Sequence, residues 1–456
     1  MRSLFAAILL SLLAACGEPL PPPAELGKLY VVTRAGPATY QEDDNGAASG
    51  FEHDLAVLLA KDLGVEAHFV MARDHAEALK LLKKGRAHMA AAALSPRNSS
   101  SLHYSRPIRE MQQFLVQNED ALPVRKPSDL AGRTVTVLAR SPQIDALESL
   151  QPRPKGLRLA KVKGLSELEL LQRVNTDPTM MAAVDSTHFD IGANFYPGLN
   201  AAFALPGKQA LAWAFPRNGD AALFARSEAF IGRIRQDGTL ARLEDRYFGH
   251  TRRLNQNDVE QFMERIQTVL PRYRRDFIEA QRLHGIDWRL IAALAYQESH
   301  WDPLATSYTN VRGMMMLTED TADRLQVSDR LDAKQSILAG ARYLAELREQ
   351  FPPDVTEPDR SWLAIAAYNL GMGHMNGARF IAELVKRDPN YWYEMKQVLP
   401  LMSRPEYYSR LKSGAGRGGE AVIMTENIRN YYDILRRLEN PAADAQAFPM
   451  SSMPPM

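Results

Sequence analysis

The chain has 456 residues, of which 45% are hydrophobic and 24% are charged, an ordinary balance for globular protein. At roughly 150 residues per domain, this length predicts two to four domains. Its 55 lysines and arginines face 54 aspartates and glutamates, so the formal net charge is only +1. This balance excludes the strong basic footprint by which proteins bind nucleic acid or an anionic membrane surface.

The first 16 residues have the pattern of a secretory signal. Arg2 is followed by an apolar run too short for a stable membrane anchor, and then by small residues. Cys16 is the only cysteine, so an intramolecular disulfide is impossible and a lone cysteine needs another explanation. We expect a signal peptide over 1–15, with an incidental cysteine as the alternative.

Residues Leu13-Ala-Ala-Cys16 resemble the bacterial lipobox, which implies cleavage before Cys16 and lipidation of that residue. Several acyl chains on one residue would anchor the protein firmly. Gly17 after the cysteine implies, by the bacterial sorting rule, the outer membrane and a position facing the periplasm. The proline-rich residues that follow predict an extended tether over 16–26.

Between residues 27 and 250, short apolar runs alternate with amphipathic helices. We expect strands over 29–33, 67–70, 88–94 and 134–138, with helices over 51–63 and 75–84. Gly64 and Gly85 stand where these two helices should end. The alternation predicts an α/β domain with a largely parallel sheet.

Three segments in this domain resemble periplasmic solute-binding proteins: 50–56 (GFEHDLA), 129–135 (DLAGRTV) and 236–249. The resemblance implies two lobes that close over a ligand by a hinge. It also implies that Arg97 holds a ligand carboxylate, for which a guanidinium is well suited, and that Asp185 meets an amino group. The alternative is that both are surface residues of a domain without a ligand. His88 stands where that family often has aspartate, which favours an altered ligand.

The pattern changes after residue 250. Residues 251–267 begin as a polar and basic stretch, which we interpret as a linker, and beyond it the chain is almost purely helical. The glycine-rich stretch 413–420 predicts a mobile loop, and the tail 441–456 predicts disorder. Helices are expected over 259–269, 273–284, 318–325, 332–351, 361–370, 378–386 and 427–438, in addition to one that begins near residue 288.

That additional helix carries an acid on its apolar stripe. Ile291, Leu294, Ala295 and Glu298 follow the i, i+3, i+4, i+7 pattern, with Asp287 as the expected N-cap and Pro303 as the expected stop. Burial without a cationic partner raises a carboxyl pKa, which is what a general acid requires at neutral pH. The alternative is a rim glutamate, or one paired with a buried arginine.

Three blocks in this helical region resemble the soluble lytic transglycosylase family. Glu298-Ser299 is followed by Ser307 nine residues after the acid, then by Gly313-Met-Met-Met and Thr321-Ala322; Ala366-Ala-Tyr-Asn-Leu-Gly forms the second block. Residues 418–432 match its closing helix more weakly. The resemblance covers about 268–440 and implies a mainly α, lysozyme-like domain that cleaves peptidoglycan glycan strands.

The same resemblance implies the chemistry. Glu298 alone would act as acid and then base, cleaving the β-1,4 bond between N-acetylmuramic acid and N-acetylglucosamine with a 1,6-anhydromuramoyl product. The residues implied to bind substrate are Ser299, Ser307, Met314, Tyr368 and Asn369. Simpler interpretations exist for two of them, a turn serine for Ser307 and core packing for Met314. Asn369 also shares a stripe with Trp362, Ile365 and Ala366, so we expect it to face the interior.

Met316 and Thr318 depart from the family pattern, which has glutamine and methionine there, and such a variant occurs in a branch that carries a solute-binding domain in front. The 10 histidines form no ligand spacing, so we expect no metal and no other cofactor. We expect the front domain to bind a stem peptide or muropeptide and to regulate the lyase. Two alternatives stay open: a hydrolytic muramidase, and a non-enzymatic sensor of wall fragments.

Overall fold

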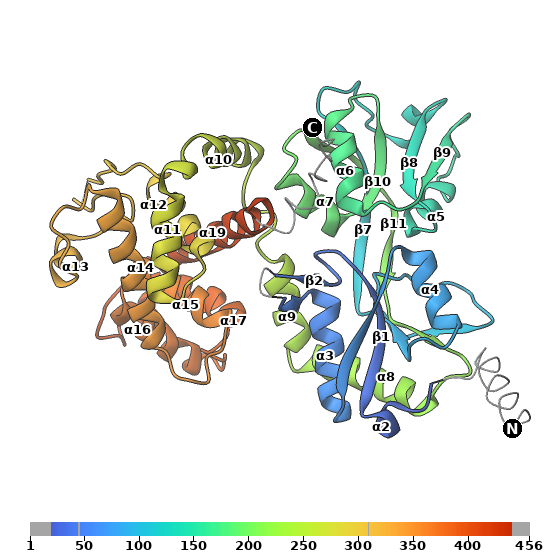
Figure 1. The fold of residues 1–456 in the computed structure, drawn as a ribbon, viewed down its shortest axis with the longest axis horizontal. Helices are drawn as coiled ribbons and strands as arrows, with labels where there is room; N and C mark the ends of the chain where they lie inside the picture. The colour runs from blue at the N-terminus through green and yellow to red at the C-terminus, as the bar shows by residue number, and fades with distance from the viewer. Residues whose placement is uncertain (1–19, 44–45, 309, 440–456) are drawn as a thin grey trace, which may run out of the picture. The chain divides into compact units, whose positions relative to one another are not determined.

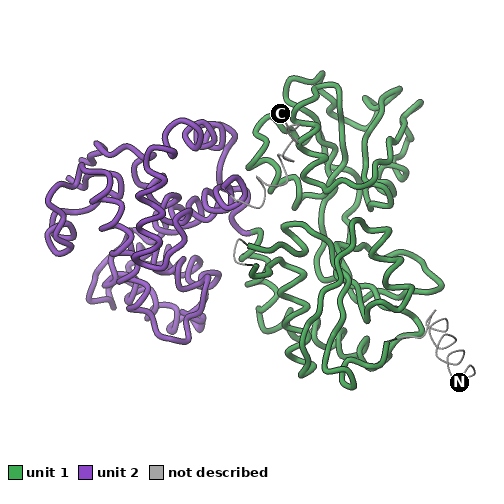
Figure 2. The backbone as a smooth tube through the Cα atoms, viewed as in Figure 1, with its two compact units in different colours: residues 1–248 green, residues 249–456 purple. Residues whose placement is uncertain are grey.

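The computed structural model describes residues 20–43, 46–308 and 310–439. The expected signal peptide 1–15, Cys16 and the tail 441–456 lie outside these residues. The chain divides into two compact units, one ending at Phe248 and the other beginning at Gly249 (Figure 2). Within the described ranges, no helix is both long enough and apolar enough to cross a bilayer.

The first unit consists of two lobes, each built on a five-stranded sheet (Figure 1). Lobe 1 has the strand order β4-β1-β5-β12-β6, in which β1 is parallel to β4 and β5 while β12 is antiparallel to its neighbours. Its strands are β1 (Lys28–Arg34), β4 (Glu66–Ala72), β5 (Met89–Ala90), β6 (Leu102–Tyr104) and β12 (Ala214–Pro216). Its helices are α3 (Phe51–Leu63), α4 (His75–Lys83), α8 (Ala221–Gln236) and α9 (Thr239–Phe248).

Lobe 2 has the order β11-β7-β10-β8-β9, with β10, β8 and β9 parallel. The expected two-lobed α/β fold is confirmed, and each lobe has a mixed sheet: β12 is antiparallel to its neighbours in lobe 1, and β7 is antiparallel to β10 and β11 in lobe 2. The strands are β7 (Arg109–Asn118), β8 (Thr134–Leu138), β9 (Arg158–Val162), β10 (Met181–Asp185) and β11 (Leu199–Leu211). The helices are α5 (Pro142–Glu148), α6 (Glu167–Thr176) and α7 (Ser186–Ala193).

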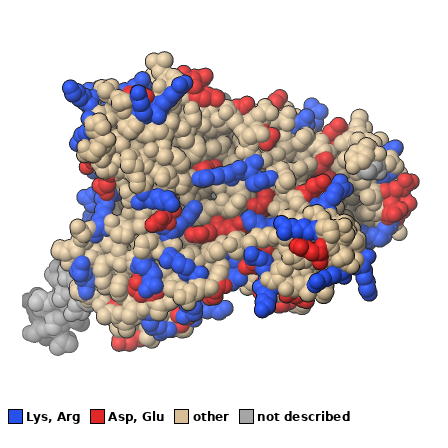
Figure 3. Space-filling model, turned by 180° about the vertical axis from the view of Figure 1, so that it is seen from behind, with Lys and Arg blue, Asp and Glu red and all other residues tan. Residues whose placement is uncertain are grey.

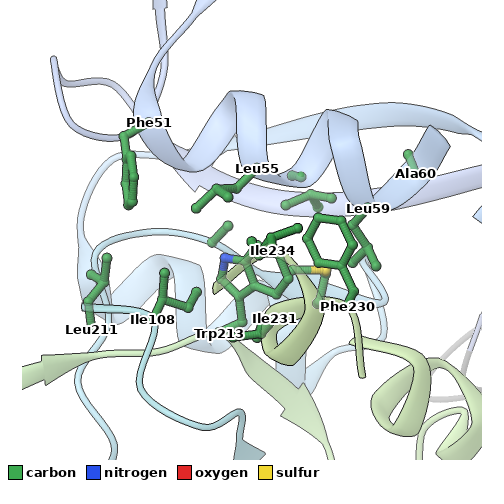
Figure 4. Packing of buried hydrophobic residues seen from close by; sticks show 14 of the residues in the cluster. Phe51, Leu55, Leu59, Ala60, Ile108, Leu211, Trp213, Phe230, Ile231 and Ile234 are labelled. Carbon is green, nitrogen blue, oxygen red and sulfur yellow. The ribbon is translucent and has the colours of Figure 1, made fainter. Parts of the chain in front are cut away.

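The core of lobe 1 forms where α3 and α8 meet the sheet. Leu55 and Leu59 of α3 lie over Trp213, and Phe230 of α8 stacks on the same indole (Figure 4). Full burial of a side chain of this size stabilises the fold by about 1.5–3 kcal/mol. The buried face of α3, which includes Leu55 and Leu59, therefore contributes several such side chains to the contact with the sheet.

Part of the expected tether belongs to lobe 1. Residues Pro23–Leu26 form the short helix α2. His88 accepts a hydrogen bond from the Tyr30 N–H at 2.9 Å through Nδ1, and its Nε2 donates to the Pro21 carbonyl at 2.9 Å. The tether is thus not extended throughout, because its last residues are bound to the domain. His88 serves this contact, which gives its difference from the family aspartate a structural explanation.

The second unit is built almost entirely of helices around α12 (Trp288–Ser299). This helix packs against α11 and α19, so it lies in the middle of the unit (Figure 1). The other helices are α10 (Gln256–Thr268), α11 (Leu270–His284), α13 (Glu319–Arg324), α14 (Ala333–Glu349), α15 (Asp359–Leu370), α16 (Met372–Leu384), α17 (Trp392–Val398), α18 (Pro405–Tyr408) and α19 (Gly418–Leu438), with a 3-10 helix over Leu399–Ser403.

Two expectations for this unit are corrected. The linker 251–267 is mostly helix α10, whose Phe262 packs on Tyr296 and Tyr431, so it belongs to the second unit. The glycine-rich loop 413–420 ends inside α19, which begins at Gly418 rather than near residue 427. A Cβ at Gly418 would lie 2.0 Å from the Leu399 carbonyl oxygen, so only glycine permits this approach.

Candidate functional site

Glu298 lies in the last turn of α12. Asp287 caps the helix by accepting the Arg289 N–H, as the sequence predicts. Ile291, Leu294 and Ala295 are fully buried, and Glu298 is half-buried at the edge of that stripe. The helix ends at Ser299 rather than at Pro303, because the chain turns into the left-handed region at His300.

The end of α12 is held by residues outside the helix. His300 and Trp301 have φ values of 52° and 60°, a conformation that is uncommon for residues other than glycine. The Trp301 indole donates to the Ala292 carbonyl at 2.8 Å, and Arg265 donates to the His300 carbonyl at 2.7 Å. Strained backbone of this kind persists only where surrounding contacts determine it. These contacts therefore fix the backbone that directly follows Glu298.

The electrostatics of Glu298 are set by burial alone. Burial raises the pKa of its carboxyl to about 8, with no charged group opposing the shift. In the described part of the chain, no residue forms a hydrogen bond or ion pair with this carboxyl. Glu298 is therefore largely protonated at neutral pH and able to donate its proton. A partnered glutamate, the alternative left open by the sequence, is excluded among these residues.

The segment from Gly313 to Leu317, here called the wall, is hydrogen-bonded to residues of α12, α14 and α15. Ser299 Oγ donates to the Met314 carbonyl at 2.8 Å, and the Met315 N–H donates to Ser336 Oγ at 3.1 Å. Gly313 has φ 82°, and a Cβ there would lie 1.8 Å from the Arg330 carbonyl oxygen. Met316 also has a positive φ, of 45°. The wall is thus bonded to Ser299, the residue that follows Glu298, and to Ser336 of α14, and Met316 adopts a φ that is uncommon for a residue other than glycine.

Tyr368, near the end of α15, closes the wall. Its hydroxyl donates to the Met315 carbonyl at 2.8 Å. Burial, followed by the nearby Glu298 and Tyr343, raises the pKa of Tyr368 well above its ordinary value. The phenol therefore stays protonated as a donor, and it lies close enough to Glu298 to respond to its charge.

Three other predicted substrate contacts occupy different places. Met314 is completely buried, so its side chain packs in the core, and the prediction that it contacts substrate is wrong. Asn369 is exposed although Ile365 and Ala366 are buried, because the last turn of α15 extends past the core. Ser307 Oγ accepts the Val311 N–H at 3.2 Å, which agrees with the turn interpretation.

The two predicted ligand residues of the first unit are both engaged within the protein. Arg97 of lobe 1 donates to the Ser141 carbonyl at 3.1 Å and pairs with Asp145 of α5 at 2.8 Å. It also lines a surface pocket of about 480 Å³. Asp185 caps α7 by accepting two N–H groups and bonds His188 at 2.7 Å.

A buried ion pair between the lobes was not found from the sequence. Arg34, at the end of β1, donates to Glu167 at the start of α6 at 3.0 Å. The sequence around each partner has a recognisable feature. Arg34 is a charged residue at the end of a buried strand, and Ser166 with Glu169 forms a capping box at the start of the helix that carries Glu167. Their pairing could not be predicted, because 133 residues separate them.

The charged side chains elsewhere are mixed. On the face seen in Figure 3, lysines and arginines are interspersed with aspartates and glutamates. That face therefore shows no broad basic surface of the kind used for nucleic acid, in line with the near-neutral net charge.

Comparison with known proteins identifies two families. Residues 29–250 match the bacterial extracellular solute-binding proteins, family 3, and residues 275–383 match the transglycosylase SLT domain. A membrane-bound lytic murein transglycosylase F from Methylobacillus flagellatus is 43% identical, covering 96% of this chain and 95% of the relative. A protein of the same name from Nitrosospira multiformis is also 43% identical, covering 91% of this chain and 87% of the relative.

Among solved structures, an ancestral arginine-binding protein bound to arginine is similar to part of the chain. The two share 21% identity with a TM-score of 0.44, covering 49% of this chain and 98% of that structure.

Proposed function

Because the chain belongs to the membrane-bound lytic murein transglycosylase F family and is a lytic transglycosylase of peptidoglycan, we propose that Glu298 is its single catalytic acid and base. The observation that supports this is the half-buried carboxyl, which has no partner among the described residues and whose pKa burial raises to about 8. Such a group carries a proton at neutral pH, and it is a stronger base than an ordinary carboxylate once that proton has left.

In the first step, Glu298 donates its proton to the glycosidic oxygen between N-acetylmuramic acid and N-acetylglucosamine. The bond from that oxygen to C1 of the muramoyl residue breaks, and the substrate's own N-acetyl oxygen stabilises the positive charge at C1. In the second step, the Glu298 carboxylate takes the proton of the muramoyl C6 hydroxyl while that oxygen bonds to C1. Glu298 is restored, and the product is a 1,6-anhydro sugar.

The ring closure consumes no water. An attacking group within the same molecule has an effective concentration on the order of 10⁵–10⁸ M when it is well oriented. The wall beside Glu298 favours this outcome over hydrolysis, because it leaves little freedom for a competing water. We assign Tyr368 to the orientation of the wall, and Ser299, Ser307 and Asn369 to contacts with the glycan.

The test is the mass of the products released from purified sacculi. Wild type is expected to release muropeptides lighter by one water than the products of a hydrolytic muramidase. Glu298→Gln, which keeps the shape but has no proton to give, is expected to release almost none. Products that carry the extra water would contradict the ring closure and support the muramidase.

Membrane attachment is proposed to occur through lipid on Cys16 after removal of residues 1–15, in the outer membrane and facing the periplasm. The support is the sequence around Cys16, together with the name "membrane-bound" that the relatives carry. Cys16→Ser is expected to move the protein from the membrane fraction to the soluble fraction. Retention of this variant in the membrane fraction would contradict lipid anchoring.

For the first unit we propose binding of a wall fragment, such as a stem peptide or muropeptide, that regulates the lyase. The support is a family of ligand-binding proteins joined to an enzyme in one chain, with Arg97 and Asp185 as proposed contacts. Titration with stem peptides is expected to raise the thermal stability of the full chain and to change its cleavage rate. No change in either quantity would contradict this role.

A further inference from the structure

Three polar side chains of lobe 1 gather around the segment that follows β5. Arg34 Nε donates to the Ala92 carbonyl at 3.2 Å, Glu52 accepts the Ala93 N–H, and His75 Nε2 lies 3.2 Å from the Ala93 carbonyl oxygen. Ala93 itself has φ 53°, in the left-handed region. The group lies at the carboxyl ends of the parallel strands β1 and β5, which is where open α/β sheets bind ligands.

Glu167 of lobe 2 enters this group. Its Oε1 accepts from Arg34 Nη2 at 3.0 Å, and the two side chains are only 10% and 5% exposed. Its other oxygen lies 4.0 Å from His188, which in turn is bonded to Asp185. A carboxylate from one lobe is thus held between cationic groups contributed by both lobes.

Some hydrogen-bond donors and acceptors of these side chains have no partner among the described residues. A guanidinium has five N–H donors, and hydrogen bonds to the described residues account for two of those on Arg34. Glu52 Oε1 is buried with no hydrogen-bond partner among these residues. Buried polar groups that serve only structure are nearly always hydrogen-bonded, so the unused hydrogen-bonding groups of Arg34 and Glu52 in lobe 1 need another explanation.

We propose that Glu167 stands in for the anionic group of a ligand at Arg34, so that the solute-binding unit closes on its own carboxylate. The ligand class is a small carboxylate, which competes with Glu167 for Arg34 and finds the free N–H groups that Glu167 leaves unused. The biological meaning of this competition rests on the proposed sensing role of the unit. The competition itself does not depend on catalysis by Glu298.

The first test measures the distance between the lobes in the full chain. Because Cys16 is the only cysteine, a Cys16→Ser background confines spin labels to Lys80→Cys on α4 and Gln172→Cys on α6, both of which are exposed positions. Glu167→Ala is expected to shift the distance distribution to longer and broader values than in the labelled parent. Asp145→Ala, which removes the exposed pair with Arg97, is the matched control and is expected to leave it unchanged.

The second test supplies the missing carboxylate. Replacing glutamate by alanine removes a fragment the size of acetate, so acetate added to Glu167→Ala is expected to restore the short distance. Acetamide has the same shape without the charge and is expected to have no effect. Arg34→Ala is expected to lengthen the distance between the lobes in the same way. Added acetate is expected to leave that distance unchanged, because the group that binds the anion is gone.

A parental distance in Glu167→Ala would overturn the proposal, and so would an opening that acetate fails to reverse. Should circular dichroism show that Glu167→Ala is unfolded, Glu167→Gln keeps the side-chain volume and carries the first test, with a longer distance expected. Glycan cleavage is assayed on the same parent sample. If the parent sample releases no ring-closed products, the proposed catalysis is contradicted, whereas the conclusion from the distance between the lobes is unaffected.

Discussion

Glu298 in the second unit is half-buried and Glu167 in the first is buried, and their pKa values move in opposite directions. Burial raises the pKa of Glu298 to about 8, and no charged group in the described part of the chain opposes this shift. Burial acts the same way on Glu167, but Arg34, His188 and His75 outweigh it and hold that pKa well below its ordinary value. The partner, rather than the depth of burial, decides which buried acid keeps its proton.

Glu52 lies between these two cases. Burial raises its pKa to about 7, although the Ala93 N–H and the charge of Arg34 both act to lower it. One hydrogen bond and a shared cation therefore only partly offset the effect of burial on this pKa. The series Glu298, Glu52 and Glu167 orders three buried acids by how much positive charge each one meets.

The largest expected effect comes from removing the proton of Glu298. Glu298→Gln should lower kcat/KM on glycan strands by about 10²–10⁴-fold, the usual contribution of a positioned acid or base. Asp320→Asn changes an exposed acid on α13 of the same unit; it is the matched control and should keep wild-type activity. An equal loss of activity in both variants would contradict the assignment of Glu298 as the catalytic acid and base.

The second prediction removes the partner of Glu167. Arg34→Ala removes the largest of the cationic influences on Glu167 and should lower the free energy of unfolding of the first unit by up to about 3–5 kcal/mol, the cost of a carboxylate left buried without a partner. Asp145→Ala removes a pair whose side chains are 38% and 56% exposed, so it should cost less than about 1 kcal/mol. Denaturant unfolding measures both, provided that the transitions of the two units are resolved. If both variants lower the free energy of unfolding equally, the buried pair of Arg34 with Glu167 is no more stabilising than the exposed pair of Arg97 with Asp145.

The third prediction concerns the sign of the pH dependence. The native pKa of Glu298 is raised, so wild type loses stability as pH rises from about 4.5 to about 8. Glu298→Gln has no such group and should gain about 1–3 kcal/mol over wild type at alkaline pH, and almost nothing near pH 4. Glu167 works the other way, because its lowered pKa stabilises the first unit above about pH 4.5 and that stability is lost on acidification. Melting temperatures of both proteins across pH measure the gain, and a gain independent of pH would contradict it.

The smallest effect is expected at the wall. Tyr368→Phe leaves the Met315 carbonyl without its donor and should lower the unfolding free energy of the second unit by about 1 kcal/mol. The change should also lower kcat more than it raises KM, because the wall orients the acid and does not bind most of the glycan. A pure KM effect would assign Tyr368 to substrate binding instead.

The sequence predicts well those features that depend only on residues close together in the chain. The buried stripe of α12 and its Asp287 cap follow from residue spacing, and the structure has them where they were expected. The same reasoning failed for Asn369, because spacing gives the face of a helix and not the point at which the helix leaves the core. Motif matching failed for Met314, because a motif does not say whether a side chain packs behind the site or lines it.

What the sequence could not predict is whether a charged group has a partner. The ion pair of Arg34 with Glu167 joins residues 133 positions apart, and each one alone looks like the end of a strand or the start of a helix. That Glu298 has no partner among the described residues is equally a property of the folded chain. The fold classes follow from the sequence, whereas the electrostatics of both sites required the structure.

The most direct test is the protonation state of the Glu298 carboxyl itself. Infrared difference spectra between wild type and Glu298→Gln isolate the carboxyl band while pH is varied. The protonated band should persist through neutral pH and disappear near pH 8. A band already in the ionised form at about pH 5, close to the ordinary glutamate value, would contradict the account.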